Sequence, residues 1–126
     1  MLAIDYGAAR TGVAVSDPTG TLARPLCVVE RVTSEAGLAR LAELIQDEHV
    51  DRVVVGLPLT LRGERGAQVG ETERFLEALR QVVDVPVDTF DERFTTALAT
   101  VGGGDAPEDA RAAAHLLSSY LAWVSR

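Results

Sequence analysis

Short apolar segments typical of β-strands dominate the first quarter of the chain. Residues 2–5 form an apolar run that ends in an acid, residues 12–16 carry β-branched side chains at alternate positions, and residues 26–32 form a third such run. The segment from Tyr6 to Thr11 is short enough for a hairpin turn, which Gly7 favours. Three successive strands with short connections predict an antiparallel meander.

Helical periodicity then alternates with further strands. Thr33 or Ser34 can cap a first helix, whose apolar face is formed by Leu38, Leu41, Leu44 and Ile45. The later elements that we expect are a buried central strand over 52–56, a polar loop over 62–70, a helix over 69–83 with Phe75, Leu76 and Leu79 inward, a strand over 85–90, a short helix over 95–101, a glycine-rich break over 102–107, and a last helix from Pro107 that buries Ala113, Leu116, Leu117 and Tyr120.

This order of elements predicts an α/β fold. Three antiparallel strands followed by alternating strands and helices give a mixed five-stranded sheet, three antiparallel strands then two parallel ones, flanked by helices. RNase H-like folds have this order of elements. A chain of 126 residues fits one such domain, so we expect a single RNase H-like domain over 1–126.

Composition narrows the class of protein. A chain that is 47% hydrophobic and 25% charged is typical of a globular protein with a core. No apolar run approaches the roughly 20 residues that span a bilayer, and the first residues lack the basic region of a signal peptide. Cys27, the single cysteine, cannot form an internal disulfide. We therefore expect a cytoplasmic protein without a membrane partner.

The net charge of −7 is unusual for a protein that binds nucleic acid, which generally has a basic face. Carboxylates clustered at a metal site would account for part of this charge until the ion binds. All 12 basic residues are arginine, which binds phosphate through a bidentate fork. The absence of lysine is equally well explained by genomic base composition.

Three acids stand where the predicted elements can bring them together. Asp5 ends the first strand, Glu92 follows the fifth strand, and Asp109 lies in the first turn of the last helix. Taken singly, each also fits a structural role, as a turn residue, a solvated charge or a helix-terminal acid. Because hard divalent cations prefer oxygen ligands, the set predicts one Mg²⁺ or Mn²⁺ site. Without metal, repulsion should raise the pKa of at least one of the three.

Four stretches of the chain, taken in order, match the motifs of one known family. They are Ile4-Asp5-Tyr6-Gly7 with Gly12 to Asp17 and Ala23 to Leu26, then Val54 to Leu59, then Asp91 to Thr96, and finally Asp109 with Ala112, Ala113, Leu117 and Tyr120. Together they resemble the YqgF family, also called RuvX. The resemblance implies an RNase H-like nuclease related to the Holliday-junction resolvase RuvC, with catalytic and metal-binding acids at Asp5, Glu92 and Asp109. It implies one of two substrates, the 5′ end of pre-16S ribosomal RNA or a four-way DNA junction.

The resemblance leaves open which residue is the second acid and which residues bind the substrate. Of the two adjacent acids we choose Glu92, because its longer side chain better spans the intervening fourth strand, and Asp91 is the alternative. The candidate substrate-binding residues are Arg10, Arg62, Arg93 and Thr95. The chain departs from the family where Thr60 replaces a frequent asparagine, and where residues 102–109 lack the usual basic side chains.

Two other classes of function compete with the nuclease. Asp5 and Gly7 with Gly12 and Ser16 also resemble the first phosphate loop of actin-like sugar kinases and ATPases, but those proteins need two such lobes. A non-catalytic module that binds nucleic acid or ribosome precursors is the third interpretation. A resolvase that cuts two strands should be a homodimer with a twofold axis, whereas an RNA-trimming enzyme need not be. The sequence leaves the dimer, the choice of metal and RNA versus DNA open.

Overall fold

The computed structural model describes residues 1–59, 66–95 and 105–125, which contain five strands, three α-helices and one 3₁₀ turn. In chain order the elements are β1 (Leu2–Asp5), β2 (Arg10–Ser16), β3 (Ala23–Glu30), α1 (Glu35–Asp47), β4 (Val53–Leu57), α2 (Ala67–Val82), β5 (Val87–Asp91), η1 (Glu92–Phe94) and α3 (Glu108–Val124). No helix in these three described stretches is long and apolar enough to cross a membrane.

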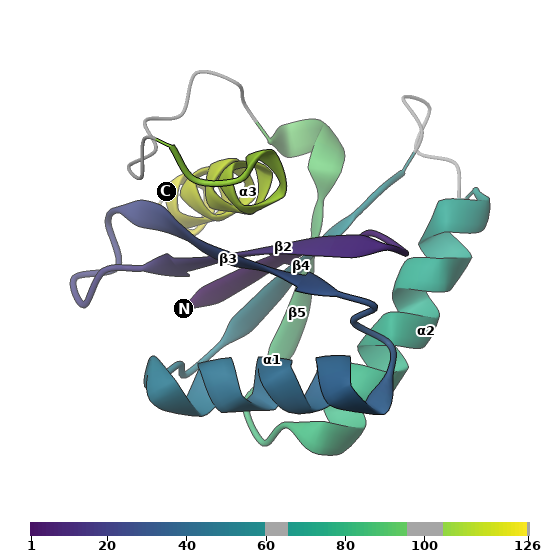
Figure 1. Ribbon diagram of the computed structural model, residues 1–126. Helices are drawn as coiled ribbons and strands as arrows, with labels where there is room; N and C mark the ends of the chain where they lie inside the picture. The colour runs from purple at the N-terminus through teal and green to yellow at the C-terminus, as the bar shows by residue number, and fades with distance from the viewer. Residues whose placement is uncertain (60–65, 96–104, 126) are drawn as a thin grey trace.

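The five strands form one mixed sheet in the order β3-β2-β1-β4-β5 (Figure 1). β2 pairs antiparallel with both β1 and β3, whereas β4 pairs parallel with both β1 and β5. The predicted α/β fold with three antiparallel and two parallel strands is thus confirmed. Because β1, β4 and β5 run in parallel, their carboxyl ends meet at one edge of the sheet, where Asp5, Leu57 and Asp91 are the last strand residues.

Several predicted boundaries are wrong by a few residues. β3 begins at Ala23 rather than at residue 26, because Ser16 pairs with Ala23 directly after the turn that contains Asp17. α2 begins at Ala67, inside the segment predicted as loop. The helix expected from residue 95 does not start there, since Thr95 has an extended backbone (φ −75°, ψ 126°), and residues 96–101 lie outside the described stretches.

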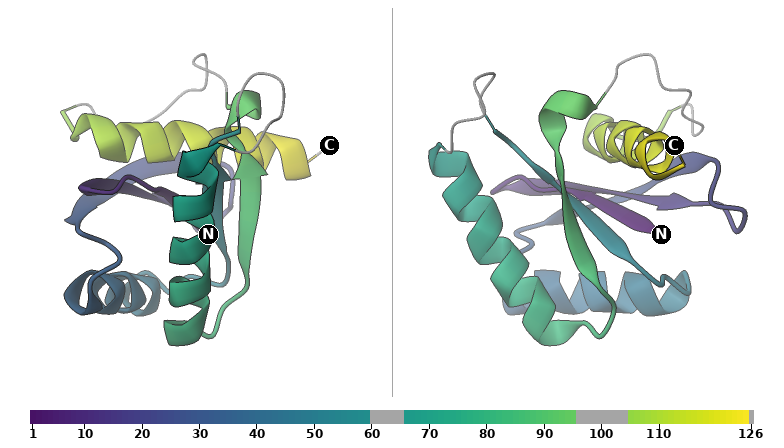
Figure 2. Two further views of the ribbon diagram at one scale, coloured as in Figure 1. Left: turned by 90° about the vertical axis from the view of Figure 1, so that its right-hand side faces the viewer. Right: turned by 180° about the vertical axis from the view of Figure 1, so that it is seen from behind.

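The two faces of the sheet are packed with side chains of different size. On the face covered by α1 and α2, the strands contribute large residues such as Leu2, Ile4, Val53 and Val55 to a core that contains Phe75. On the opposite face, α3 packs over Ala3, Ala14 and Ala23 with its own Ala113 and Ala114. Figure 2 shows α3 on the side of the sheet opposite to α1 and α2. The small side chains on both surfaces let α3 approach the strands closely.

Candidate active site

Asp5 and Glu92 come into direct contact at the edge where the parallel strands end. Asp5 is the last residue of β1, and Glu92 is the first residue of η1, directly after β5. Their carboxyl groups share a hydrogen bond. Both residues are half-buried. Two acids in contact can share such a bond only if one of them holds a proton, so the pair constitutes a carboxyl–carboxylate dyad in the absence of a cation.

Gly56 makes this contact possible. β4 lies between β1 and β5 in the sheet, so the Glu92 side chain must cross it to reach Asp5. A Cβ atom placed on Gly56 would lie 2.7 Å from Oε1, 3.0 Å from Cγ and 3.2 Å from Cδ of Glu92. The absence of a side chain at position 56 therefore leaves the space in which the Glu92 side chain lies over β4.

Burial and a neighbouring negative charge raise the pKa of both acids. For Glu92, burial first and the charge of Asp5 second raise the pKa from 4.5 to about 7. Burial also raises the pKa of Asp5, with a smaller contribution from the charge of Asp109, against the hydrogen bond from Glu92, which lowers it. The site therefore holds negative charge at a cost that a bound cation would remove.

Asp109 reaches this edge through the close packing of α3 on β2. Gly12 pairs with Asp5 in the sheet, and a Cβ atom on Gly12 would lie 1.8 Å from the backbone oxygen of Asp109. Any side chain at position 12 would push the first turn of α3 away from the sheet. Gly12 thus fixes Asp109 near Asp5, which is close enough for the Asp109 charge to affect the pKa of Asp5.

The Asp109 carboxylate nevertheless binds Arg10 rather than the dyad. Nε of Arg10, the first residue of β2, donates to Oδ2 of Asp109 at 2.9 Å, and both side chains are about half exposed. Within the three described stretches, no three acidic, histidine or cysteine side chains lie close enough together to hold a metal ion as they stand. The structure brings two predicted metal ligands together and leaves the third beside them.

The alternative acid, Asp91, has a different role in this structure. Its carboxylate accepts a hydrogen bond from the backbone N–H of Arg93 at 2.9 Å and so caps η1, and it also pairs with the Arg93 guanidinium. The bond from Arg93 lowers the pKa of Asp91. Asp91 and Arg93, the latter a candidate for substrate binding, are thus bound to each other.

The remaining substrate-binding candidates are less defined. The backbone N–H of Thr95 donates to the Glu92 carbonyl at 3.1 Å, and its hydroxyl is buried with no hydrogen-bond partner among the described residues. Arg62 lies outside the described stretches. Whether Arg10, Arg62, Arg93 or Thr95 binds substrate stays a prediction.

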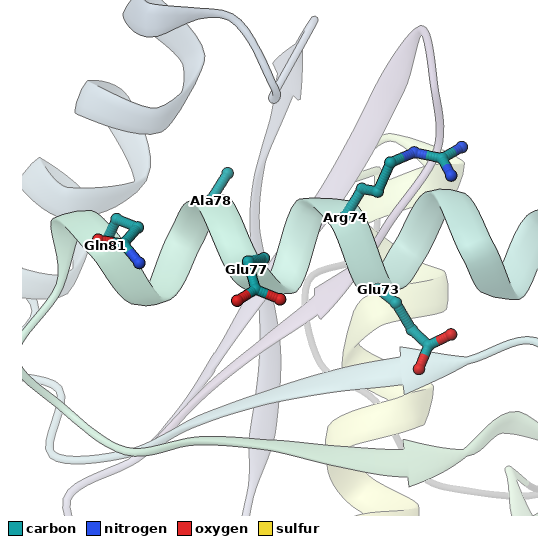
Figure 3. Close-up of a pocket in the computed structure, with 5 residues that line it drawn as sticks. All are labelled: Glu73, Arg74, Glu77, Ala78 and Gln81. Carbon is teal, nitrogen blue, oxygen red and sulfur yellow. The ribbon is translucent and has the colours of Figure 1, made fainter.

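A cavity of about 210 Å³ opens beside the dyad. Asp5, Tyr6 and Glu92 line one side of it, and Gln68, Glu71 and Thr72 line the other side from α2. The Tyr6 ring stacks on buried Phe75 with centroids 5.0 Å apart. This contact holds the Tyr6 side of the cavity in place. Three larger hollows formed by the described residues do not include the predicted acids. The hollow in Figure 3, for example, lies along α2 and is lined by Glu73, Arg74, Glu77, Ala78 and Gln81.

Sequence reasoning missed the residues that act through packing. Gly12 and Gly56 create the space for Asp109 and Glu92, and Gln68, Glu71 and Thr72 bring α2 to the cavity. A glycine at the end of a continuous apolar strand could have indicated a close approach at position 56. No signal in the sequence indicated which face of α2 would line the site.

Comparison with known proteins gives one family over nearly the whole chain. A family model described as "RuvX: Holliday junction resolvase" matches residues 1–123. A Chloroflexus aurantiacus protein named "Putative pre-16S rRNA nuclease" is 44% identical over 99 residues, which are 79% of this chain and 65% of that relative. This chain therefore spans less than two thirds of that relative's length. A Desulforamulus reducens protein of the same name is 35% identical over 130 residues, 96% of this chain and 95% of that one.

A solved structure gives the fold independently. Thermus thermophilus RuvC in complex with a Holliday junction substrate aligns over 99% of this chain and 97% of that chain, with a TM-score of 0.62 and 22% identity. Another structure of Thermus thermophilus RuvC aligns with a TM-score of 0.60 and 21% identity. Likeness at this level of identity concerns the fold alone, and it confirms the predicted RNase H-like class.

Proposed function

Since the chain belongs to the RuvX family, as its motifs predicted, we propose that it is a divalent-metal-dependent nuclease whose active site is the Asp5–Glu92 dyad with Asp109 beside it. The observation that carries the proposal is the dyad itself. Two half-buried carboxyl groups in contact, with both pKa values raised, form an arrangement that destabilises the protein and therefore needs a functional reason.

The donor set fits a hard divalent cation. Asp5 and Glu92 would hold Mg²⁺ or Mn²⁺ through carboxylate oxygens, and Asp109 would join them after leaving Arg10. When bound, the ion would supply Lewis-acid stabilisation of the charge that develops on the phosphate. Asp5 and Glu92 would ionise together as the cation arrives, so the proton that the dyad shares is released to solvent.

Arg10 has a second role in this proposal. Its guanidinium now neutralises Asp109 in an exposed ion pair, which contributes little to stability. When Asp109 turns toward the cation, the guanidinium loses its partner at the edge of the site. Arginine binds phosphate oxygens well, so Arg10 would then hold the substrate backbone next to the dyad.

The names of the relatives favour an RNA substrate. Proteins 35–44% identical to this chain are named as pre-16S rRNA nucleases, whereas the RuvC structures are only 21–22% identical. We therefore propose processing of pre-16S ribosomal RNA, and keep cleavage of a four-way DNA junction as the second candidate because the family description names that activity. The homodimer and the cytoplasmic location stay predictions.

One assay tests metal dependence and substrate together. Purified protein is incubated with Mg²⁺, Mn²⁺ or a chelator, and with either a labelled pre-16S leader RNA or a synthetic four-way junction. We expect metal-dependent cutting with the leader preferred, and loss of cutting in Asp5→Asn, Glu92→Gln and Asp109→Asn. Glu71→Gln is a matched control, because it removes an acid from the same cavity that is not among the proposed ligands.

The outcomes separate the alternatives. Preference for the junction would replace the RNA substrate but keep the nuclease. If a folded, metal-loaded protein binds either nucleic acid without cutting it, the protein is a binding module. Cutting that persists in a chelator or in Asp5→Asn would overturn the proposed site.

A further inference from the structure

A pair of exposed aromatic rings lies beyond the dyad. Phe94, the last residue of η1, and Trp123, near the end of α3, stack nearly parallel with centroids 5.2 Å apart and planes 13° apart. They are 46% and 43% exposed. Figure 2 shows the end of α3 beside β5 and η1. Large aromatic rings that remain half exposed beside a proposed active site are a feature that the fold does not require.

Buried aromatic side chains support the two exposed rings. Phe90 lies under both, with its centroid 6.1 Å from each ring, and Tyr120 packs edge-on against Phe90 at 5.5 Å. The Arg93 guanidinium lies 5.9 Å from the Phe94 centroid. We call Phe94 and Trp123 the aromatic platform. Because its support is buried core, the platform is preorganised and would lose little conformational entropy on binding.

The platform is too small to be the interface with a second copy of the chain. Two rings of this kind, each somewhat less than half exposed, present roughly 200 Å². A stable dimer buries about 800 Å² on each partner. The area of the platform corresponds instead to one or two flat ligands the size of a nucleobase.

The charge of the chain also favours a stacked base. With a net charge of −7, the protein gains less from attraction to the phosphate backbone than a basic nuclease does. Stacking of bases on aromatic rings adds affinity that does not depend on charge. Phe94 is also only two residues after Glu92, so a strand bound at the dyad would run close to the platform.

We propose that the platform formed by Phe94 and Trp123 stacks an unpaired nucleobase of the substrate, a few nucleotides away from the bond at the dyad. This proposal rests on the proposed nuclease function. It adds a specificity element to that function, because only a substrate with unpaired nucleotides on this side of the site can use the platform.

The single tryptophan of the chain provides a direct measurement. Since Trp123 is the only tryptophan, all tryptophan fluorescence comes from the platform. The protein, with divalent metal chelated to prevent cutting, is titrated with short unpaired DNA, with RNA of the same sequence, and with an abasic strand of equal charge. We expect quenching by the strands that carry bases and little change with the abasic strand. The DNA and RNA strands identify the preferred source of the base.

Variants test the same point without the reporter. Phe94→Ala and Trp123→Ala should weaken binding of a labelled base-containing strand by about 5- to 150-fold, the loss expected for one stacked base. Phe94→Tyr should bind as the parent does. Leu22→Ala, which removes an exposed apolar side chain far from η1 in the sequence, is the matched control and should also bind normally. Thermal melts check that each variant is folded.

Four results would overturn the proposal. Unchanged fluorescence on saturation with base-containing strands excludes stacking on Trp123. Equal affinity for abasic and base-containing strands refutes the platform, and so does failure to bind any strand, whereas the nuclease is tested separately by the cleavage assay. Conversion of a dimer into a monomer by Phe94→Ala, measured by sedimentation, would assign the platform to a second copy of the chain.

Discussion

The two edges of the sheet each have an aspartate beside the end of a strand, in opposite environments. Asp17, which follows β2, accepts hydrogen bonds from the Thr19 hydroxyl at 2.6 Å and from the backbone N–H groups of Leu22 and Thr21 at 3.0 and 2.9 Å. These bonds lower its pKa. Asp5, at the other edge, is half-buried beside Glu92 and has a raised pKa.

This difference separates an acid that stabilises a turn from one that we propose as a metal ligand. The charge of Asp17 is stabilised by donors of the protein itself, so the turn between β2 and β3 benefits from it. The charge of Asp5 is opposed by its surroundings, so the protein is less stable for containing it. The proposed metal site would explain such a cost, since stability and activity often conflict at active sites.

Exchanging each aspartate for asparagine should give opposite results, and this is the largest effect that we expect. Asp5→Asn should reduce cutting by about 10³-fold or more, because a metal ion supplies several kcal/mol of charge stabilisation, and it should raise the stability of the metal-free protein near neutral pH. Asp17→Asn should keep its activity and lose stability. Cleavage rates and thermal melts of the same preparations measure both. Equal loss of activity in a folded Asp17→Asn protein would contradict the contrast.

Gly56→Ala should have the next largest effect. A Cβ atom there would meet the Glu92 side chain at 2.7 Å, so the carboxyl must move away from Asp5. We expect the rate of cutting to fall by roughly 10- to 100-fold, the effect typical of residues that position metal ligands. The free energy of unfolding should fall by at most about 3 kcal/mol. Gly66→Ala is the control, since a Cβ atom at that position would meet nothing within 4 Å. Full activity of Gly56→Ala would show that Glu92 need not cross β4.

The pKa of Glu92 predicts how stability depends on pH. Its folded value of about 7 lies above the ordinary 4.5, so the folded state holds the proton more tightly than the unfolded state. In a chelator, the stability that comes from protonated Glu92 should be fully present below about pH 4.5. It should be lost as the pH rises through about 7. Glu92→Gln should flatten this decline and raise the melting temperature by roughly 2–6 °C above pH 7. Identical pH profiles for the two proteins would refute this origin of the decline.

The exposed ion pairs at the two edges should show the smallest difference. Arg10 pairs with Asp109 at the dyad edge, and Arg24 pairs with Glu48 at the other edge. Each pair is exposed enough that Arg10→Gln and Arg24→Gln should each cost less than about 1 kcal/mol of stability. Only Arg10→Gln should strengthen Mn²⁺ binding, by a few fold in calorimetry, because it leaves Asp109 without a competing partner. Equal Mn²⁺ affinities in the two variants would show that Arg10 does not compete for Asp109.

The sequence predicted the sheet well where strands are buried on both faces. β1 and β4 consist of continuous apolar residues, and their predicted bounds are correct to within one residue. The edge strand β3 was placed three residues too late, because its start depends on the turn that Asp17 organises. Periodicity records which side chains are buried, but it does not record where a turn ends.

The candidate site was predictable as a set of residue types but not as an arrangement. Strand ends and helix starts pointed to Asp5, Glu92 and Asp109, and the reach of Glu92 across β4 followed from its length. The contact between Arg10 and Asp109 joins residues 99 positions apart, and the space at Gly12 exists only once α3 lies on β2. Such features come from tertiary packing, which local patterns do not encode.

The length of α3 separates Asp109 from the aromatic platform. The helix carries Asp109 in its first turn and Trp123 in its last, which places them roughly 21 Å apart along its axis. That spacing corresponds to about six nucleotides of a stacked strand at ~3.4 Å each. If Asp109 binds the metal and the aromatic platform holds a base as proposed, the length of α3 would set how far from that base the strand is cut.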